Sequence, residues 1–451
     1  MTYPIDLHRA HWESVARRRR LLLLAIVALT TIVASGYMAY VLPHQGRHWL
    51  EMILIVFFAM LFGWISIGFW TSLTGFCLMI AGSARWKIGP PAVNGSGGQS
   101  LSRTAVLMPI YNEDTHRVFA GLNAMYRSLE KTGALDTFDL FVLSDTTKPD
   151  VWLAEERAWL TLCRQTGAFG RIYYRHRMPN LKRKSGNIAD FCRRWGSGYT
   201  YMIVLDADSL MAGTTMVRMV RTMDQNADVG ILQTPPMLAG KNSMLARLQQ
   251  FTNHIYGPMF AAGLHFWQLG DAQYWGHNAI IRIDPFMAHC ALPRLSGRPP
   301  MGGDIMSHDF VEAALMRRAG WGVWLAYDLT ESYEEPPPTL IDELLRDRRW
   351  CQGNLQHLRL LLTRGLLPAH RFLFLNGAMS YISALLWFCF LALSTGEAIT
   401  MALFTPDYFP REGSLFPDWP VWDPSWMIIL LASTIIILFL PKLMGLVLIF
   451  C

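Results

Sequence analysis

The chain has 451 residues, of which 52% are hydrophobic and only 16% are charged, and its formal net charge is +6. Because soluble globular proteins carry about 25% charged residues, this composition argues against a wholly soluble protein. The basic excess borders apolar segments, at Arg17–Arg20 and Arg85–Lys87, which indicates contact with membrane lipids and no binding of nucleic acid. The seven cysteines include no C-x-x-C pair, which argues against a zinc site or a disulfide framework.

The first elements in the chain are two apolar segments that are long enough to cross a membrane. Residues 21–42 form an uninterrupted apolar run and residues 52–84 carry no charge, whereas a bilayer core needs about 20 apolar residues. The arginines before the first segment place residues 1–20 in the cytoplasm by the positive-inside rule. We therefore predict a membrane hairpin over 21–84, followed by a Gly/Ser/Pro-rich linker over 85–100.

Residues 101–339 alternate between β-rich runs and amphipathic stretches, which predicts an α/β domain with parallel strands. Ligands of such sheets bind at the carboxyl ends of the strands, so the polar residues that end the strands are candidates for a functional site. The predicted strands are 103–111, 138–145, 170–177 and 199–209, and the predicted helices are 117–133, 151–166 and 186–196.

Asp206 and Asp208 follow the apolar run "YMIVL" at a spacing of two residues. Unpaired acids at the edge of a core are costly unless a partner neutralises them. A divalent cation that bridges a diphosphate would do so, because hard cations prefer oxygen ligands. A solvated turn explains the same pattern, since Asp is common in turns. A calcium loop does not, because "DADSLMAG" lacks the downstream glycine and glutamate of such loops.

Two further stretches precede predicted helices and carry candidate groups. "LKRKSGN" (181–187) places Lys184 before a helix N-terminus, which is a natural phosphate site, and an exposed basic loop is an equal alternative. "MSHDF" (306–310) offers Asp309 either as a helix N-cap or as a general base that takes a proton from a hydroxyl.

The C-terminal part of the chain returns to the membrane. Residues 340–371 are predicted to form interfacial helices, because "RDRRWCQGN" (346–354) continues as a basic amphipathic stretch. Residues 372–404 and 426–451 each contain a membrane span, and the acid-rich loop 405–425 lies outside. The "PK" within the last segment predicts a kink or the start of a fifth span. Since the chain stops inside apolar sequence, we expect a truncated chain and further membrane helices.

The order of the motifs "PIYNE", "LSD", "KSGN", "DAD", "HD" and "RRW" resembles that of the processive, membrane-integrated members of glycosyltransferase family 2. Among these cellulose- and hyaluronan-synthase-like enzymes, "SDTTKPD", "GHNAIIR" and "RDRRWCQGN" look like the bacterial subfamily that makes osmoregulated periplasmic glucans. The resemblance covers roughly the whole chain. It implies a cytoplasmic, Rossmann-like α/β domain of the glycosyltransferase type A fold, inserted between transmembrane helices of the inner membrane.

The resemblance also implies roles for individual residues. Asp309 would be the catalytic base, although many relatives have Glu-Asp where this chain has His308 and Asp309. Arg346 stands where the broader family has the glutamine of its Q-x-x-R-W motif. Asp206 and Asp208 would hold Mg²⁺ or Mn²⁺. The nucleotide-sugar site would comprise Tyr111, Glu113, Asp145, Lys184, Asp206 and Arg349, and the acceptor site His277, Asn278, Arg346 and Trp350.

These roles imply a one-step displacement in which the acceptor hydroxyl loses its proton to Asp309 while UDP leaves, so that α-linked glucose becomes β-linked. The resemblance implies that the product is the β-1,2-linked backbone of periplasmic glucans, built from UDP-glucose on a growing glucan chain, with acyl carrier protein as a further partner. Two alternatives stay open. One is another membrane polysaccharide synthase of the cellulose or hyaluronan type, and the other is a non-catalytic membrane sensor that binds a nucleotide sugar.

Overall fold

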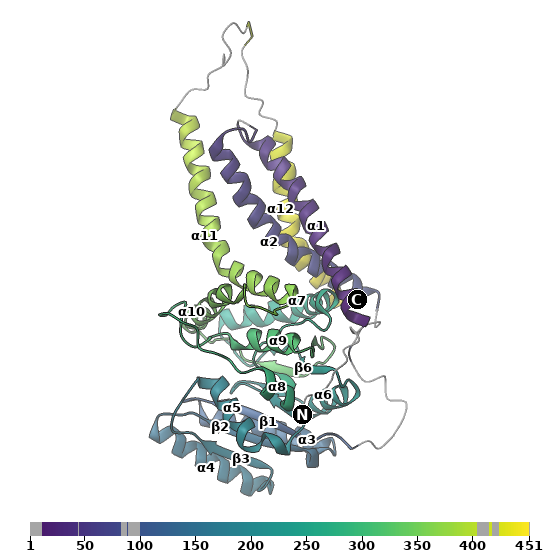
Figure 1. Ribbon diagram of the computed structural model, residues 1–451, viewed down its shortest axis with the longest axis vertical. Coiled ribbons are helices and arrows are strands. Elements are labelled where there is room, and N and C mark those ends of the chain that lie inside the picture. The colour runs from purple at the N-terminus through teal and green to yellow at the C-terminus, as the bar shows by residue number, and fades with distance from the viewer. Residues whose placement is uncertain are drawn as a thin grey trace.

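The computed structural model describes residues 11–43, 45–82, 88, 100–403, 415–416 and 424–450. A bundle of long helices stands on an α/β domain (Figure 1). Most of the predicted linker 85–100 and of the predicted outer loop 405–425 lies outside the described residues, as does the first half of the predicted N-terminal segment.

The α/β domain is built on a seven-stranded sheet with the order β3-β2-β1-β4-β8-β6-β9. Core clusters on both faces bury the central strands almost completely, which explains their continuous apolar runs. The strands and helices predicted over 103–209 are all present. They are β1 (Thr104–Ile110), α3 (Thr115–Lys131), β2 (Phe138–Ser144), α4 (Pro149–Thr166), β3 (Ile172–His176), α5 (Arg183–Trp195) and β4 (Tyr201–Val204).

The second half of the sheet departs from the predicted parallel arrangement, because β8 runs antiparallel to both β4 and β6. β8 begins beside the end of β6, where Ala279 pairs with Gln233, and therefore has to run back through the sheet. As a result, the residues just before β8 lie at the edge where β4 ends. The remaining strands of this sheet are β6 (Val229–Gln233), β8 (Ala279–Arg282) and β9 (Gly322–Leu325). A smaller sheet has the order β5-β10-β7, from β5 (Leu210–Met211), β10 (Ser332–Glu334) and β7 (Met237–Leu238).

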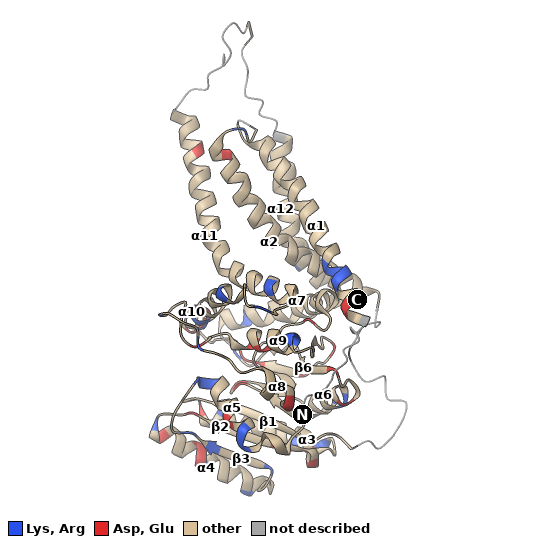
Figure 2. Cartoon of the chain, viewed as in Figure 1, with Lys and Arg blue, Asp and Glu red and all other residues tan. Residues whose placement is uncertain are grey.

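Four helices in the described part of the chain are long and apolar enough to cross a membrane, and they coincide with the four predicted spans. Figure 2 shows these helices nearly free of charge above the charged base of α1, whereas charged residues are spread over the α/β domain. The last helix continues through Pro441, so a fifth span does not begin at that proline. The four are α1 (His11–Val41), α2 (Trp49–Ile80), α11 (Pro368–Leu403) and α12 (Pro424–Phe450).

Helix α1 begins well before the apolar run, and its charged first turns dock on the α/β domain. Trp12 packs edge-on against Trp324, with the ring centroids 5.4 Å apart. Arg20 and Arg317 both form ion pairs with Asp271, at 2.6 and 2.7 Å. The basic segment that the sequence places at the membrane surface therefore also ties the first helix to the domain.

Helix α7 (Met244–Gln268) joins the membrane hairpin to the domain through backbone contact with α2. A Cβ on Gly75 would lie 1.9 Å from the carbonyl oxygen of Met259, and a Cβ on Gly263 would lie 2.0 Å from that of Thr71. Because no side chain fits between the two helices at these points, small residues set their separation.

Gly75→Ala should therefore push α7 away from α2 and lower the stability of the folded chain. Overpacking of this kind costs about 1–3 kcal/mol. The measurement is the thermal unfolding temperature in detergent, with Gly68→Ala on the same helix as control, because nothing lies within 4 Å of a Cβ at Gly68. Equal unfolding temperatures for the two variants would contradict the close contact.

Candidate active site

Neighbouring strand ends bring the predicted site segments to one edge of the sheet. Asp145 directly follows β2, Tyr111 directly follows β1, and Asp206 lies two residues after β4, and these strands are adjacent in the order β2-β1-β4. His277 precedes β8, which starts beside the end of β4. The polar strand ends therefore meet, as the parallel arrangement of the first strands requires.

The "DAD" carboxylates differ in their surroundings. Asp206 forms an ion pair with Lys184, whose ammonium also donates to the carbonyl oxygen of Gly276 at 2.7 Å. Burial acts to raise the pKa of Asp206, but Lys184 and His277 outweigh it and the pKa is lowered, in keeping with a side chain that is still 39% exposed. Asp208 forms no ion pair with any described residue, and burial together with the charge of Asp206 raises its pKa. His277 and Arg117 oppose this shift without forming an ion pair with Asp208.

Glu334, at the end of β10, faces these carboxylates from the second sheet. One of its oxygens lies 3.1 Å from Nε2 of His277. Burial raises the pKa of Glu334, the negative charges of Asp208 and Asp206 add to the shift, and His277 and Arg346 oppose it. Glu334 and His277 therefore form one electrostatic cluster with the two carboxylates of the "DAD" motif.

Asp309 lies next to this cluster, with Gly276 between its carboxylate and Lys184. It is the second residue of α9 (His308–Arg318), whose N-cap is Ser307, so the interpretation of Asp309 as an N-cap is wrong. A Cβ on Gly276 would lie 3.2 Å from Oδ2 of Asp309, and the φ of +88° at this position also favours glycine. Because the Gly276 carbonyl accepts from Lys184, the same residue contacts both sides of the site.

A histidine–carboxylate pair adjoins the candidate base, with Glu312 buried and His308 partly exposed. Nδ1 of His308 lies 3.0 Å from Oε1 of Glu312, and this carboxylate outweighs burial to raise the pKa of His308. Burial also raises the pKa of Asp309, a shift that His308 opposes and Glu312 increases. The departure from the Glu-Asp of many relatives therefore places a histidine, held by its own carboxylate, next to Asp309.

The predicted nucleotide side contains an arginine that sequence analysis did not identify. Both carboxylate oxygens of buried Asp145 accept hydrogen bonds from Arg177, at 2.8 and 2.7 Å. Tyr111 is half exposed at the end of β1. Desolvation in the cleft and the charge of Asp208 raise the pKa of Glu113, although its side chain remains exposed. A uridine contact through Asp145 would have to be shared with Arg177.

Asn278 does not face the acceptor as predicted. It is fully buried, and its amide donates to the hydroxyl of Ser332 at 2.8 Å and to the carbonyl oxygen of Tyr333 at 3.2 Å. These bonds tie the start of β8 to β10, so Asn278 supports the cleft and does not contact a sugar directly. His277 keeps a partly exposed side chain.

Helix α10 (Leu340–His357) carries the remaining predicted residues. The guanidinium of Arg346 lies over the ring of Trp350, 4.6 Å from its centroid, and pairs with Glu343 at 2.9 Å. Trp350 is 49% exposed, and the exposed Arg349 forms no ion pair with described residues. The same helix exposes an apolar face, which fits the predicted interfacial position and comprises Leu340, Ile341, Leu344 and Leu345.

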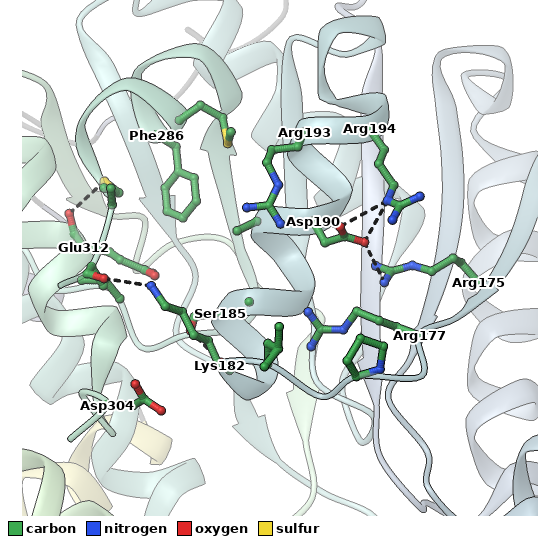
Figure 3. Close-up of a pocket in the computed structure, with 18 of the residues that line it drawn as sticks. Arg175, Arg177, Lys182, Ser185, Asp190, Arg193, Arg194, Phe286, Asp304 and Glu312 are labelled. Carbon is green, nitrogen blue, oxygen red and sulfur yellow. Dashed lines mark hydrogen bonds and ion pairs between the residues drawn. The ribbon is translucent and has the colours of Figure 1, made fainter. Parts of the chain in front are cut away.

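A basic cavity of about 980 Å³ borders the site near the N-terminus of α5, and none of the predicted site residues lines it. Figure 3 shows Arg175, Arg193 and Arg194 gathered around Asp190, with Phe286 on the opposite wall. Asp190 pairs with all three arginines. Because one carboxylate serves three guanidinium groups, this flank of the site is positively charged and attracts anions.

The residues around the "DAD" motif fit a cation that arrives with a diphosphate. Within the described ranges, no group of three or more His, Cys, Asp or Glu side chains is arranged to hold a metal ion by itself. Mg²⁺ commonly uses one or two carboxylates and takes its other ligands from phosphates and water. Asp208, unpaired beside Asp206, provides that donor set.

The family model described as "Glycosyl transferase family group 2" matches residues 201–448, which is more than half of the chain. The chain belongs to this family. Within the family, "Glucans biosynthesis glucosyltransferase H" of Ralstonia nicotianae is 54% identical over 434 residues, covering 96% of this chain and 50% of the relative. The protein of the same name from Dickeya dadantii is 51% identical over 460 residues, covering 97% of this chain and 54% of the relative.

These relatives confirm the predicted resemblance to the periplasmic-glucan subfamily, and the chain spans about half the length of the curated relatives it matches. A solved structure of the mannosyltransferase PcManGT from Pyrobaculum calidifontis, in complex with GDP-Man and Mn²⁺, superposes with a TM-score of 0.53 at 16% identity. The superposition covers 89% of this chain and 96% of the mannosyltransferase. It confirms the predicted glycosyltransferase type A fold.

Sequence analysis missed three groups that the fold brings to the site of this family member. Arg177 and Glu334 lie in stretches without a recognisable motif, so no sequence signal indicated them. Gly276 carried a weak signal, because it opens "GHNAIIR" and a glycine beside an apolar run often marks a close backbone approach.

Proposed function

We propose that the chain is the inverting, UDP-glucose-dependent glucosyltransferase part of a synthase of periplasmic glucans. The observation that carries the proposal is a single cluster: Lys184 pairs with Asp206 of the "DAD" motif and donates to the carbonyl of Gly276, and Asp309 lies against the same glycine. The names of the relatives support glucose as the sugar and periplasmic glucan as the product. UDP as the nucleotide and the β-1,2 linkage rest on the motif resemblance.

The mechanism follows from the two sides of the cluster. Asp309 takes the proton from the acceptor hydroxyl as that oxygen attacks the anomeric carbon, and the bond from this carbon to UDP breaks. Lys184 and Arg349 would bind the diphosphate. A divalent cation held by Asp206 and Asp208 would stabilise the charge that develops on the leaving phosphate. Attack from the face opposite to UDP converts the α-linked donor into a β-linked product.

The proposed location is the bacterial inner membrane, with the α/β domain in the cytoplasm. The four apolar helices and the arginines at the start of α1 support this orientation. The growing glucan would leave the site past α10, next to the membrane helices. A contact with acyl carrier protein rests on the resemblance alone and remains a prediction.

Competition between sugar nucleotides tests the choice of donor. Membranes that contain the chain should incorporate labelled glucose from UDP-glucose, and an excess of unlabelled UDP-glucose should suppress the signal. UDP-N-acetylglucosamine or UDP-glucuronic acid should not. Suppression by either of these would favour a synthase of the chitin or hyaluronan type, and binding without any turnover would favour a nucleotide-sugar sensor.

Trp350→Ala should reduce polymer synthesis about 30-fold, because loss of an aromatic anchor costs about 2 kcal/mol. Trp350 is half exposed, and the guanidinium of Arg346 lies over its ring, which suits stacking against an acceptor sugar. The yield of labelled polymer measures the effect, and Trp387→Ala on the exposed face of α11 is the matched control. Normal polymerisation by Trp350→Ala would mean that α10 serves only as a charged surface helix.

A further inference from the structure

Helix α10 is hydrogen-bonded to residues 300–306, the segment that leads into α9. The side-chain amide of Gln356 is fully buried and contacts four backbone groups of this segment. Its Nε2 donates to the carbonyl oxygens of Pro300, Gly302 and Asp304, at 3.2, 3.4 and 3.4 Å. Its Oε1 accepts from the N–H of Met306 at 3.0 Å. One side chain therefore satisfies backbone groups of residues 300–306, which form no helix or strand.

Two neighbours on the same face of α10 extend the contact to the N-cap of α9. A Cβ on Gly353 would lie 2.1 Å from Oγ of Ser307, so the helix backbone and the cap touch. Nε2 of buried His357 lies 2.9 Å from the carbonyl oxygen of Ser307. Burial lowers the pKa of His357 to about 4, so the ring is neutral at pH 7 and donates to this carbonyl. Since Asp309 is two residues further on, the position of α10 fixes the position of its carboxylate.

We propose that Gln356 is a positioning residue, which holds Asp309 in register with the groups that α10 presents to the acceptor. The inference rests on the proposed function of Asp309 as the base. Trp350 lies on the same helix, within two turns of Gln356. Helix α10 thus carries both Trp350, the predicted acceptor contact, and Gln356, whose amide determines the position of Asp309. A misplacement of about 1 Å between such groups costs about 100-fold in rate.

The test compares Gln356→Leu with Gln352→Leu in the full chain. Gln352 lies one turn earlier, is only partly buried and donates to the same Pro300 carbonyl at 3.1 Å. The measurement is kcat per binding site, where the number of sites comes from titration of the detergent-solubilised protein with UDP. Gln356→Leu should lower kcat per site about 10- to 100-fold and shift the acid limb of the pH–rate profile, whereas Gln352→Leu should match the wild type. Gln356→Glu keeps the size and the bond from Met306 but turns an oxygen toward the carbonyl oxygens of Pro300, Gly302 and Asp304, so it should also lower kcat per site.

A purely structural role would reduce the number of UDP sites and leave kcat per site and the pH profile unchanged, and that result would overturn the inference. If Gln356→Leu does not fold, kcat per site and the pH–rate profile of Gln356→Glu distinguish the positioning role from a purely structural one. The proposed function fails separately, when the wild type does not transfer glucose or when Asp309→Asn transfers it normally. The inference alone fails when Asp309→Asn is inactive but both Gln356 variants have the kcat per site of the wild type.

Discussion

Asp309→Asn should abolish glucosyl transfer while UDP binding persists. Asparagine keeps the size of the side chain but takes up no proton, and the loss of a general base costs about 100- to 10,000-fold in kcat. Asp309 lies against Gly276, whereas Lys184 pairs with Asp206, so the Kd for UDP should stay within about twofold of the wild type. The measurement pairs UDP-glucose turnover with UDP titration on the same preparation. Asp304→Asn is the control, because it makes the same change on an exposed side chain of the same segment.

The pH dependence of the wild type adds a second readout for the same residue. The base works only when it is deprotonated, and burial raises the pKa of Asp309 above its usual value. Activity should therefore be present above this raised pKa and be lost as the pH falls through it, at a higher pH than the value of about 3.9 that an ordinary aspartate would give. Turnover by Asp309→Asn at the wild-type rate, or an acid limb at the ordinary value, would contradict its role as the base.

The second large effect is expected at the "DAD" motif. Asp208→Asn should remove most of the activity and weaken metal binding about 10- to 100-fold, as the loss of a carboxylate at a metal site commonly does. The reason is that Asp208 forms no ion pair with a described residue and lies next to the charge of Asp206, so a divalent ion would compensate both carboxylates. Excess chelator should have a similar effect on the wild type, and added Mg²⁺ or Mn²⁺ should restore its activity.

Mn²⁺ binding in the presence of UDP, followed by electron paramagnetic resonance, measures this effect without relying on activity. Asp150→Asn is the control, since Asp150 is exposed at the start of α4 and the change is chemically the same. Full activity in excess chelator, or unaltered Mn²⁺ binding by Asp208→Asn, would exclude the metal role of this pair.

Sequence patterns predict the first half of the domain and the four apolar helices because those features depend on local signals. Strand–helix alternation is visible over residues 101–209, and apolar runs with few or no charges are visible over residues 21–84, 372–404 and 426–451. The antiparallel β8 could not be predicted, since its direction is set by where Ala279 meets Gln233 across the sheet. The burial of Asn278 has the same origin, because its partners Ser332 and Tyr333 come from a distant strand.

The site shows the same division between local motifs and long-range contacts. Asp206, Asp208 and Asp309 were identified because each follows or precedes a recognisable element. Glu334, which pairs with His277, and Gln356, which contacts the segment before α9, were not identified, because they come from segments far from their partners in the sequence. The N-cap interpretation of Asp309 was wrong because α9 begins at His308, so Asp309 lies inside the first turn and Ser307 holds the N-cap position, without a side-chain cap hydrogen bond.

The most direct test of glucosyl transfer is the product itself. Membranes that contain the chain are incubated with radiolabelled UDP-glucose and Mg²⁺, and the labelled polymer is isolated and subjected to linkage analysis, with Asp309→Asn membranes in parallel. The wild type should give a glucose polymer with β-1,2 linkages, and Asp309→Asn should give none. Label recovered only as free glucose or in a polymer of another sugar, or equal polymer from both membranes, would contradict the proposed function.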